Sequence, residues 1–387
     1  MKQHITVGID IGTSITRVVV CTESPRDGEL PRVLGIGTAE TRGMRHGYIV
    51  AHDDIVTTLK RAIAEAEKES GQRIRTAALC IGGIGLASEY ATGTSITSRA
   101  DGIISKLDID KAISEAEPTL DLKNKAILHS FPVAFKVDGK ELPTRPDGIS
   151  GTRLEVKALF ITCFQQHLDD LLAAVNDAGI KVTSFTATPI ATQKLLLTDL
   201  QRNFGCVLID IGAETVSISI FENNTLTSLH VFGIGSLDIT KDIALGLRIT
   251  PEEAENVKLG VVSFQNVPKK KLDEIIEARL SDIFELVDKY LRKIGRSGLL
   301  PAGAIIIGGG SQMAMIEAVA KTMLKVPVRM GYLELPGVRG PIKDQRAIVA
   351  YGVATSTIDG TTTKSRGTAD ADGFIKVLKD FFKQLMP

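Results

Sequence analysis

The chain has 387 residues, of which 43% are hydrophobic and 24% are charged, and its formal net charge at pH 7 is zero. This length predicts two or more domains or subdomains with an ample core, and the composition is ordinary for a globular protein. The neutral balance excludes a global positive field of the kind that attracts nucleic acid, so we expect no nucleic-acid partner. No apolar run reaches the about 18 residues that a membrane-spanning helix needs.

The four cysteines, Cys21, Cys80, Cys163 and Cys206, lie far apart and show none of the spacings typical of metal ligands. Each lies in or beside an apolar run, so we interpret them as small core residues, as suits a reducing cytoplasm. The chain enters a predicted strand almost at once, which favours a protein without a signal peptide.

The first half alternates between strand and helix patterns. Residues 5–20 and 32–38 are predicted strands, and residues 55–70 predict an amphipathic helix with Ile55, Leu59, Ile63 and Ala66 on one face. A short buried strand at 76–81 ends at Gly82-Gly83. A further buried strand at 158–164 precedes a helix over 167–178, which ends at Gly179.

The pattern changes between residues 84 and 157. Two strand-like pieces, 126–131 and 133–137, flank a helical stretch at 109–117, and Pro118, Pro132, Pro143 and Pro146 interrupt the segment. We therefore expect a small α+β subdomain inserted into the first half.

The second half begins at about Gly205 with a predicted meander over 206–221 and 225–232. Helices are predicted over 236–245, after an N-cap at Thr250, over 272–294 and over 346–357. A buried strand at 304–307 ends in Gly308-Gly309-Gly310.

The most informative feature is the tripeptide Asp-Ile-Gly, which occurs at 10–12 and again at 210–212. Each copy ends an apolar strand and opens a turn with hydroxyl side chains, and a second β-rich run follows each turn. A repeated unit suggests two similar halves that face each other. Two such turns would hold a polyphosphate by backbone N–H groups, and Asp10 and Asp210 would bind its metal.

These segments resemble the actin–chaperone–sugar kinase superfamily. Its two phosphate segments are similar to residues 8–14 and 210–215, and its adenosine segment is similar to residues 305–311. Glu255 and Lys258 share one helix face where chaperone-like members hold the nucleoside, although a surface ion pair is the alternative for this pair.

The resemblance implies ATP and Mg²⁺ as cofactors, with Asp10 and Asp210 holding the waters of the metal. The residues expected around the nucleotide are Gly12, Thr13, Ser14, Arg17, Asp210, Gly212, Ala213, Glu214, Thr215, Gly235, Glu255, Lys258, Gly308, Gly309, Gly310 and Gln312.

Within the superfamily, the chain resembles the FtsA family of bacterial cell-division proteins over nearly all of its length. Segments 128–132, 137–139, 148–155 and 232–247 carry this resemblance. The resemblance implies a fold of the α/β class. We expect a duplicated actin-like (ribonuclease H-like) two-domain fold, with an inserted small α+β subdomain and a C-terminal amphipathic helix. The expected parts are a first actin-like domain (1–83 and 158–204), the inserted subdomain (84–157), a second actin-like domain (205–235 and 301–358), a small helical subdomain (236–300), a flexible linker (359–372) and the helix (373–387).

Three departures from the family pattern concern the phosphate site. Ile15 stands where relatives often carry Lys, so Arg17 is the nearest cation. The second turn contains Ala213 and Glu214, and an acid near phosphate repels it unless a metal intervenes. Thr188 stands where hydrolytic relatives place the Glu that orients water, and a hydroxyl is no base at neutral pH. We expect ATP·Mg binding with slow or absent hydrolysis.

The C-terminal segment combines a polar stretch, 359–372, with an apolar helical stripe. The polar stretch would let the following helix leave the body and lie on a membrane surface; docking on the protein's own core is the alternative. The stripe and the residues interleaved with it are Phe374, Ile375, Val377, Leu378, Phe381, Phe382 and Leu385, with Lys376, Lys379 and Lys383. Each Lys adds attraction to anionic lipid.

The resemblance implies a protein that polymerises and tethers FtsZ filaments at the cytoplasmic face of the inner membrane, at the division site. Its implied partners are the C-terminal tail of FtsZ, other copies of the chain, anionic inner-leaflet lipid and other division proteins. Cations for an acidic FtsZ peptide would be Arg279, Lys289, Arg292, Lys293 and Arg296, although a solvated helix face is the alternative for each.

Three other functions remain open. A PilM-like adaptor of type IV pili shares the inserted subdomain but lacks the linker and amphipathic tail. A small-molecule kinase would need a catalytic acid for the substrate hydroxyl, and we find no convincing candidate. A chaperone would need a separate peptide-binding domain, which the 29 residues after the predicted fold are too few to supply.

Overall fold

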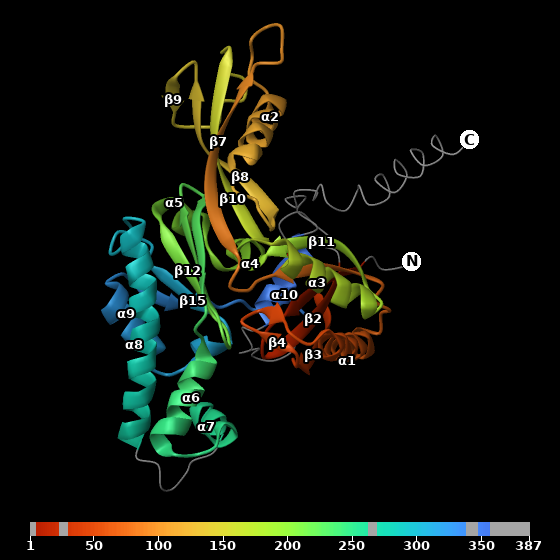
Figure 1. Ribbon diagram of the computed structural model, residues 1–387, viewed down its shortest axis with the longest axis vertical. Coiled ribbons are helices and arrows are strands. Elements are labelled where there is room, and N and C mark those ends of the chain that lie inside the picture. Colours follow the sequence, from red (N-terminus) through yellow and green to blue (C-terminus); the bar gives the residue numbers. More distant parts are fainter. Residues whose placement is uncertain (1–4, 23–29, 262–268, 338–346, 357–387) are drawn as a thin grey trace, which may run out of the picture.

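The computed structural model describes residues 5–22, 30–261, 269–337 and 347–356. Two five-stranded sheets form its body and share one topology (Figure 1). The first has the order β11-β6-β1-β2-β3, with β1 at Ile5–Ile11, β2 at Ile15–Thr22, β3 at Val33–Glu40, β6 at Thr76–Ile81 and β11 at Lys181–Ala187. The second has the order β14-β13-β12-β15-β16, with β12 at Cys206–Ile211, β13 at Val216–Glu222, β14 at Thr225–Phe232, β15 at Ala304–Ile307 and β16 at Val328–Met330.

In each sheet, three antiparallel strands are followed by two parallel ones: β1 pairs antiparallel with β2 and parallel with β6, as β12 does with β13 and β15. The duplication predicted from the repeated Asp-Ile-Gly is therefore confirmed in the strand order.

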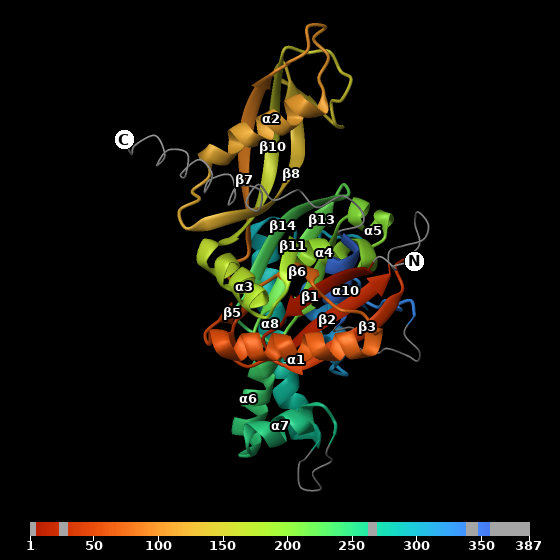
Figure 2. The ribbon, with the colours of Figure 1, turned by 90° about the vertical axis from the view of Figure 1, so that its right-hand side faces the viewer.

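Helices cover both faces of the first sheet (Figure 2). Helix α1 (His52–Ser70) buries the predicted face and ends at Gly71 in the left-handed region, and its start lies three residues earlier than expected. Helix α10 (Ile348–Ser356) packs on β1 and β2. Both contacts need glycine, because a Cβ on Gly37 would lie 1.8 Å from the Ala62 carbonyl oxygen and one on Gly8 would lie 2.0 Å from that of Ala350.

Three further helices follow in the chain. Helix α3 (Gln165–Asp177) precedes β11, α4 (Thr188–Leu196) follows it, and α5 (Asp199–Phe204) leads to β12, the first strand of the second sheet. The small hairpin of β4 (Met44–Arg45) and β5 (Tyr48–Ile49) precedes α1. All four cysteines are buried and unpaired, as predicted.

The second half carries its helices below and beside its sheet (Figure 1). They are α6 (Ser236–Leu247), α7 (Pro251–Lys258), α8 (Lys269–Lys293) and α9 (Ile316–Leu324), with the 3₁₀ turn η2 at Gly309–Gln312. The predicted cap at Thr250 is confirmed, because its hydroxyl accepts from the Glu253 N–H at 3.2 Å while the Glu253 carboxylate accepts from the Thr250 N–H at 2.8 Å.

The inserted segment forms a separate four-stranded sheet of order β7-β10-β8-β9, with α2 (Lys106–Ala116) on one face and the 3₁₀ turn η1 at Glu117–Thr119 (Figure 2). Its strands are β7 (Ala87–Ile96), β8 (Lys125–Val137), β9 (Lys140–Leu142) and β10 (Arg153–Phe164). This agrees with the expected α+β insertion.

Two strand predictions within the insertion were wrong. The pieces 126–131 and 133–137 are one strand, β8, which continues through Pro132. The ladder between β8 and β10 shifts register next to Pro132, so the missing N–H of the proline falls at a bulge. Similarly, β10 begins at Arg153 rather than at 158, so one strand joins the inserted sheet to α3.

The linker and amphipathic helix predicted over 359–387 lie outside the described residues, together with the membrane-binding side chains assigned to them.

Candidate functional site

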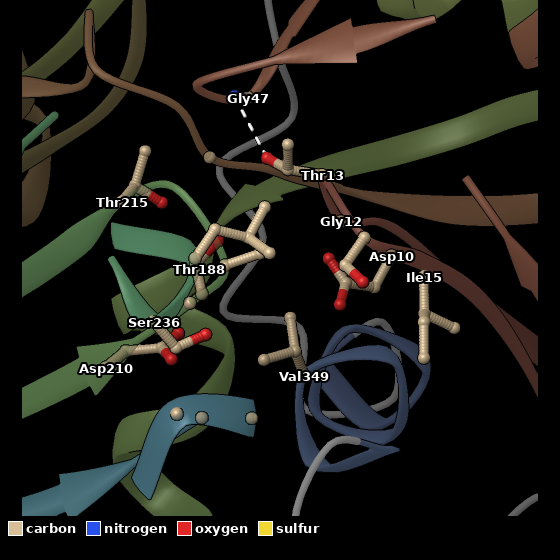
Figure 3. Close-up of a pocket in the computed structure, with 18 of the residues that line it drawn as sticks. Asp10, Gly12, Thr13, Ile15, Gly47, Thr188, Asp210, Thr215, Ser236 and Val349 are labelled. Atoms are coloured by element: carbon tan, nitrogen blue, oxygen red, sulfur yellow. Dashed lines mark hydrogen bonds between the residues drawn. The ribbon is translucent and has the colours of Figure 1, made fainter. Parts of the chain in front are cut away.

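A cavity of about 460 Å³ lies between the two halves, where the turns after β1, β12 and β15 converge (Figure 3). This volume is in the range of small-molecule and cofactor sites. Of the residues predicted around the nucleotide or metal, those that line it are Asp10, Gly12, Thr13, Ser14, Arg17, Asp210, Gly212, Ala213, Thr215, Glu255, Lys258, Gly308, Gly309, Gly310 and Gln312.

The β1–β2 and β12–β13 hairpins place two carboxylates at matching positions. Asp10 pairs in the ladder with Arg17, and Asp210 pairs with Ser217. The second turn closes by a hydrogen bond of 2.8 Å from the Gly212 N–H to the Thr215 carbonyl oxygen. Figure 3 shows Asp10 and Asp210 on opposite sides of the cavity.

The third turn, after β15, approaches the second carboxylate so closely that only glycine fits. A Cβ on Gly308 would lie 2.3 Å from Asp210 Oδ1 and 2.4 Å from the Ile211 carbonyl oxygen. Gly308 also has φ of +92°, which side chains disfavour. The predicted Gly turn is thus a close backbone approach to the acid, and Gly308, Gly309 and Gly310 all line the cavity.

Burial shifts the protonation of both carboxylates. It raises the pKa of Asp10 to about 6, against the opposing charge of Arg17. Burial raises the pKa of Asp210 to about 7, and the charge of Asp10 adds to this shift. A bound cation would favour the charged forms of both acids.

The donor set fits a cation that keeps most of its own waters. Among the described residues, no group of three or more His, Cys, Asp or Glu side chains could enclose a metal. Two carboxylates facing a phosphate-sized space suit Mg²⁺, which binds through one or two carboxylates, waters and substrate phosphates.

Glu255 and Lys258 lie at the edge of this cavity on α7. Lys258 Nζ lies 2.7 Å from a Glu255 carboxylate oxygen and donates to Thr240 Oγ1 at 2.8 Å and to the Ser236 carbonyl oxygen at 3.1 Å. The Lys258 side chain is only 6% exposed. The Glu255 side chain is 36% exposed, so the pair is a part-buried network at the rim of the cavity, with the cation enclosed and the carboxylate partly open to solvent.

Thr188 lies between the two carboxylates, at the start of α4 (Figure 3). Its hydroxyl donates to the Ile81 carbonyl oxygen at 3.2 Å and lies 3.1 Å from Cys80 Sγ. A threonine hydroxyl cannot act as a general base at neutral pH, so Thr188 itself cannot activate a water molecule in that way.

Two predicted residues do not line the cavity. Glu214 turns to the β4–β5 hairpin, where its carboxylate accepts from the His46 N–H at 2.7 Å. Gly235 packs closely against the turn after β12, because a Cβ there would lie 2.4 Å from the Ala213 carbonyl oxygen. Lining residues that sequence reasoning did not assign include Gly47, Gly82, Gly83, Ser236 and Val349. The sequence did carry a signal for Gly82 and Gly83, because a Gly pair directly after a buried strand has the same pattern as the three turns that were assigned to the site.

The cations predicted to bind an acidic peptide are mostly engaged within the chain. Arg279 bonds Asp242 in a bidentate pair, at 2.5 and 3.0 Å. Lys289 pairs with Glu285 at 2.8 Å, Arg292 with Asp288, and Arg296 with Glu222 at 2.8 Å. Lys293 lies near His230, whose pKa is lowered by burial and by this cation.

The sequence has clear relatives. The profile described as "Cell division protein FtsA" matches residues 207–352, and that described as "SHS2 domain inserted in FTSA" matches residues 85–162. Over 361 residues the chain is 32% identical to the cell division protein FtsA of Bacillus subtilis, covering 88% of this chain and 81% of that one. The chain belongs to the FtsA family.

Other FtsA proteins agree with this assignment. The one from Pseudomonas aeruginosa is 31% identical over 346 residues, covering 84% of this chain and 82% of that one. The one from Escherichia coli is 25% identical, covering 99% of this chain and 98% of that one. The inserted α+β sheet corresponds to the SHS2 domain of the FtsA family.

Solved structures show the same actin-like α/β fold. The chain aligns with one from the PilM–PilN type IV pilus biogenesis complex at a TM-score of 0.67 and 17% identity, covering 91% of this chain and 98% of that one. MreB5 of Spiroplasma citri bound to ADP aligns at 0.52 and 12% identity, covering 93% and 97%. Among the described residues of this FtsA-family protein, no helix is both long and apolar enough to cross a membrane.

Proposed function

We propose that this FtsA-family chain is an ATP-binding adaptor that polymerises and tethers FtsZ filaments to the cytoplasmic face of the inner membrane at the division site. The observation that carries the nucleotide part is the cavity itself, which two matching Asp-Gly turns and a third Gly turn enclose from both halves. Solved MreB5 structures of this fold are described as bound to ADP and to AMPPNP, which supports a nucleotide as the occupant.

In this proposal, backbone N–H groups of the three Gly turns bind the phosphates, and Asp10 and Asp210 hold the waters of Mg²⁺. Lys258 and Glu255, with Gly308 to Gly310, position the nucleoside. A Mg²⁺ ion held by these two carboxylates would supply positive charge between them and the phosphates. The nucleotide then favours the closed arrangement of the two halves, which we propose is competent to polymerise.

The membrane part rests on the sequence after residue 358. Burying a large apolar side chain completely stabilises by about 1.5–3 kcal/mol, and each Lys near anionic lipid adds about 1 kcal/mol. Insertion at an interface is only partial, and ordering the helix costs about 1–2 kcal/mol per residue before its hydrogen bonds form. A single tail therefore binds weakly, whereas a filament of many copies binds strongly through avidity.

The FtsZ part rests on family membership, with α6 to α8 as the proposed docking region. Four of the five cations proposed to bind FtsZ already pair with carboxylates of this chain. An acidic FtsZ peptide would therefore have to displace one of these carboxylates, which are Asp242, Glu285, Asp288 and Glu222. Such exchange predicts modest affinity with strong salt dependence.

Recruitment of fluorescent FtsZ to anionic vesicles tests the proposal, comparing the full chain with one that ends at Ile358, both with ATP and Mg²⁺. We expect recruitment by the full chain and none by the truncated one. Vesicle binding without FtsZ recruitment would support the membrane tether and refute FtsZ as the partner, which would favour an adaptor of this fold with a different partner. Absence of vesicle binding would refute the tether.

A further inference from the structure

The hairpin turn between β4 and β5 contacts the turns after β1 and β6 in its own half and the turn after β12 in the second half. We call Arg45, His46 and Gly47 the bridging turn. His46 and Gly47 have φ of +47° and +83°, as in the primed turns that join tight hairpins. A non-glycine residue in the left-handed region persists only where its surroundings fix it, and such strain is common at functional sites.

The bridging turn contacts both cavity turns of its own half. The Gly47 N–H donates to Thr13 Oγ1 at 3.2 Å, the dashed line in Figure 3. A Cβ on Gly47 would lie 2.5 Å from Gly83 Cα, so the turn passes directly over the Gly82-Gly83 pair. The Ile84 N–H donates to the His46 carbonyl oxygen at 3.3 Å. These contacts fix the bridging turn to the first phosphate turn.

Two of these residues, Arg45 and His46, reach across to the second half and contact Glu214. Its carboxylate accepts from the His46 N–H at 2.7 Å and from the Arg45 guanidinium at 3.4 Å. The His46 Nδ1 atom lies 3.0 Å from the Glu214 carbonyl oxygen, within hydrogen-bond distance. Glu214 is 5% exposed, so these donors compensate for much of the cost of burying its charge.

Glu214 is also part of the second phosphate turn. It lies between Ala213 and Thr215, which line the cavity. Two hydrogen bonds from the start of α6 also hold this turn. The Ser236 N–H donates to the Gly212 carbonyl oxygen at 2.9 Å, and the Leu237 N–H donates to the Ala213 carbonyl oxygen at 2.8 Å. A shift of the carboxylate would therefore displace backbone N–H groups that face the proposed phosphates.

We infer that Glu214 is a positioning residue that links the two phosphate turns through the bridging turn, so that binding of a nucleoside polyphosphate and closure of the two halves reinforce each other. This inference rests on the proposed nucleotide binding. It opposes the expectation from sequence, in which the Glu214 charge repels phosphate. The two views differ in sign, because removing the charge weakens binding if Glu214 positions the turns and strengthens binding if it repels the ligand.

The experiment uses the full chain with Glu214→Gln and Glu214→Ala. Glu222→Gln is the matched control, because Glu222 forms a part-buried ion pair with Arg296 inside the second half alone. Amide hydrogen exchange at His46 and Gly47 is measured without nucleotide, and the Kd for ATP is measured with Mg²⁺. We expect Glu214→Ala to speed exchange at both amides and to raise the Kd by about tenfold, as for loss of a charged hydrogen bond, with Glu214→Gln between it and wild type.

Exchange that is unchanged in Glu214→Ala, or a Kd that is unchanged or lower in a folded variant, would overturn the inference. If Glu214→Ala does not fold, Glu214→Gln decides by the same two measurements. Wild-type protein that binds no ATP would instead refute the proposed function, and the exchange data without nucleotide would still decide whether Glu214 holds the bridging turn.

Discussion

Asp10 and Asp210 occupy equivalent positions in two sheets of the same topology, but only Asp10 has a cation opposite it. Its ladder partner is Arg17, whereas that of Asp210 is Ser217. Directly opposed residues lie on the same face of a sheet. Burial raises the pKa of both acids; the charge of Arg17 opposes this at Asp10, whose pKa is about 6, whereas the charge of Asp10 adds to it at Asp210, whose pKa is about 7.

The first prediction concerns the metal. Asp210→Asn keeps the size of the side chain and removes the charge, so we expect binding of ATP with Mg²⁺ to weaken by about 10- to 100-fold, as for a lost charged contact of about 1.5–3 kcal/mol. Binding measured with and without EDTA checks this, with Asp199→Asn as an exposed control. An equal effect of EDTA on variant and wild type would contradict the prediction.

The second prediction concerns pH and stability without nucleotide. The pKa of Asp210 is higher in the folded state than its ordinary value of 3.8, so the folded state binds more protons, and stability from this group falls as pH rises from about 4 to about 7. His129 acts in the opposite direction, because burial lowers its pKa to about 4 and its charging destabilises the fold as pH falls.

His129 contributes equally to the free energy of unfolding of wild type and of Asp210→Asn, so its contribution cancels in the difference between them. The free energy of unfolding of wild type minus that of Asp210→Asn should therefore decrease between pH 5 and pH 7.5, as measured by urea denaturation. A difference that is flat or rising over this interval would show that the carboxyl group keeps an ordinary pKa in the fold.

The third prediction concerns the contact between β1 and α10. Gly8→Ala places a Cβ 2.0 Å from the Ala350 carbonyl oxygen and 2.7 Å from the Ala354 nitrogen, so we expect destabilisation by about 1–3 kcal/mol or more. The control is Gly71→Ala, where φ is +66° and no atom of the described chain lies within 4 Å of the new Cβ. Only the backbone cost of about 1–2 kcal/mol applies there. Equal losses in urea denaturation would argue against the close packing.

The fourth prediction concerns hydrolysis. Thr188 donates to the Ile81 carbonyl oxygen and supplies no base, so phosphate release from ATP should be far slower than the about 1–10³ s⁻¹ typical of enzymes. Thr188→Ala should leave that slow rate within about threefold of wild type, because loss of a general base would cost about 10²–10⁴-fold. Rapid turnover by wild type would contradict slow hydrolysis, and a large loss of rate in Thr188→Ala would show that this threonine takes part in activating water.

Much of the fold and the cavity could be predicted, because the informative patterns are local. Asp10 and Asp210 each end an apolar strand within a turn that the next few residues close, so the repeat is visible in a short window. The buried face of α1 and the cap at Thr250 follow from the same short-range rules.

The failures involve partners far apart in the chain. Glu214 was expected beside the nucleotide because it lies between Ala213 and Thr215, but its carboxylate accepts a hydrogen bond from His46, 168 residues away in the other half. Arg279 of α8 and Arg296, which follows α8, pair with Asp242 and Glu222, and the sequence alone did not indicate either partner. Pro132 suggested a strand end, and only the register with β10 shows the bulge that accommodates it.

Helix α10 is the last described element before residues 357–387, and its backbone lies directly on Gly8 of β1, two residues before Asp10. Tension applied to the chain beyond Ser356 would thus reach the strand of the first carboxylate with no intervening side chain to absorb it. If the tail is the anchor, the mechanical load of a filament would pass through the strand that carries Asp10, beside the cavity between the two halves.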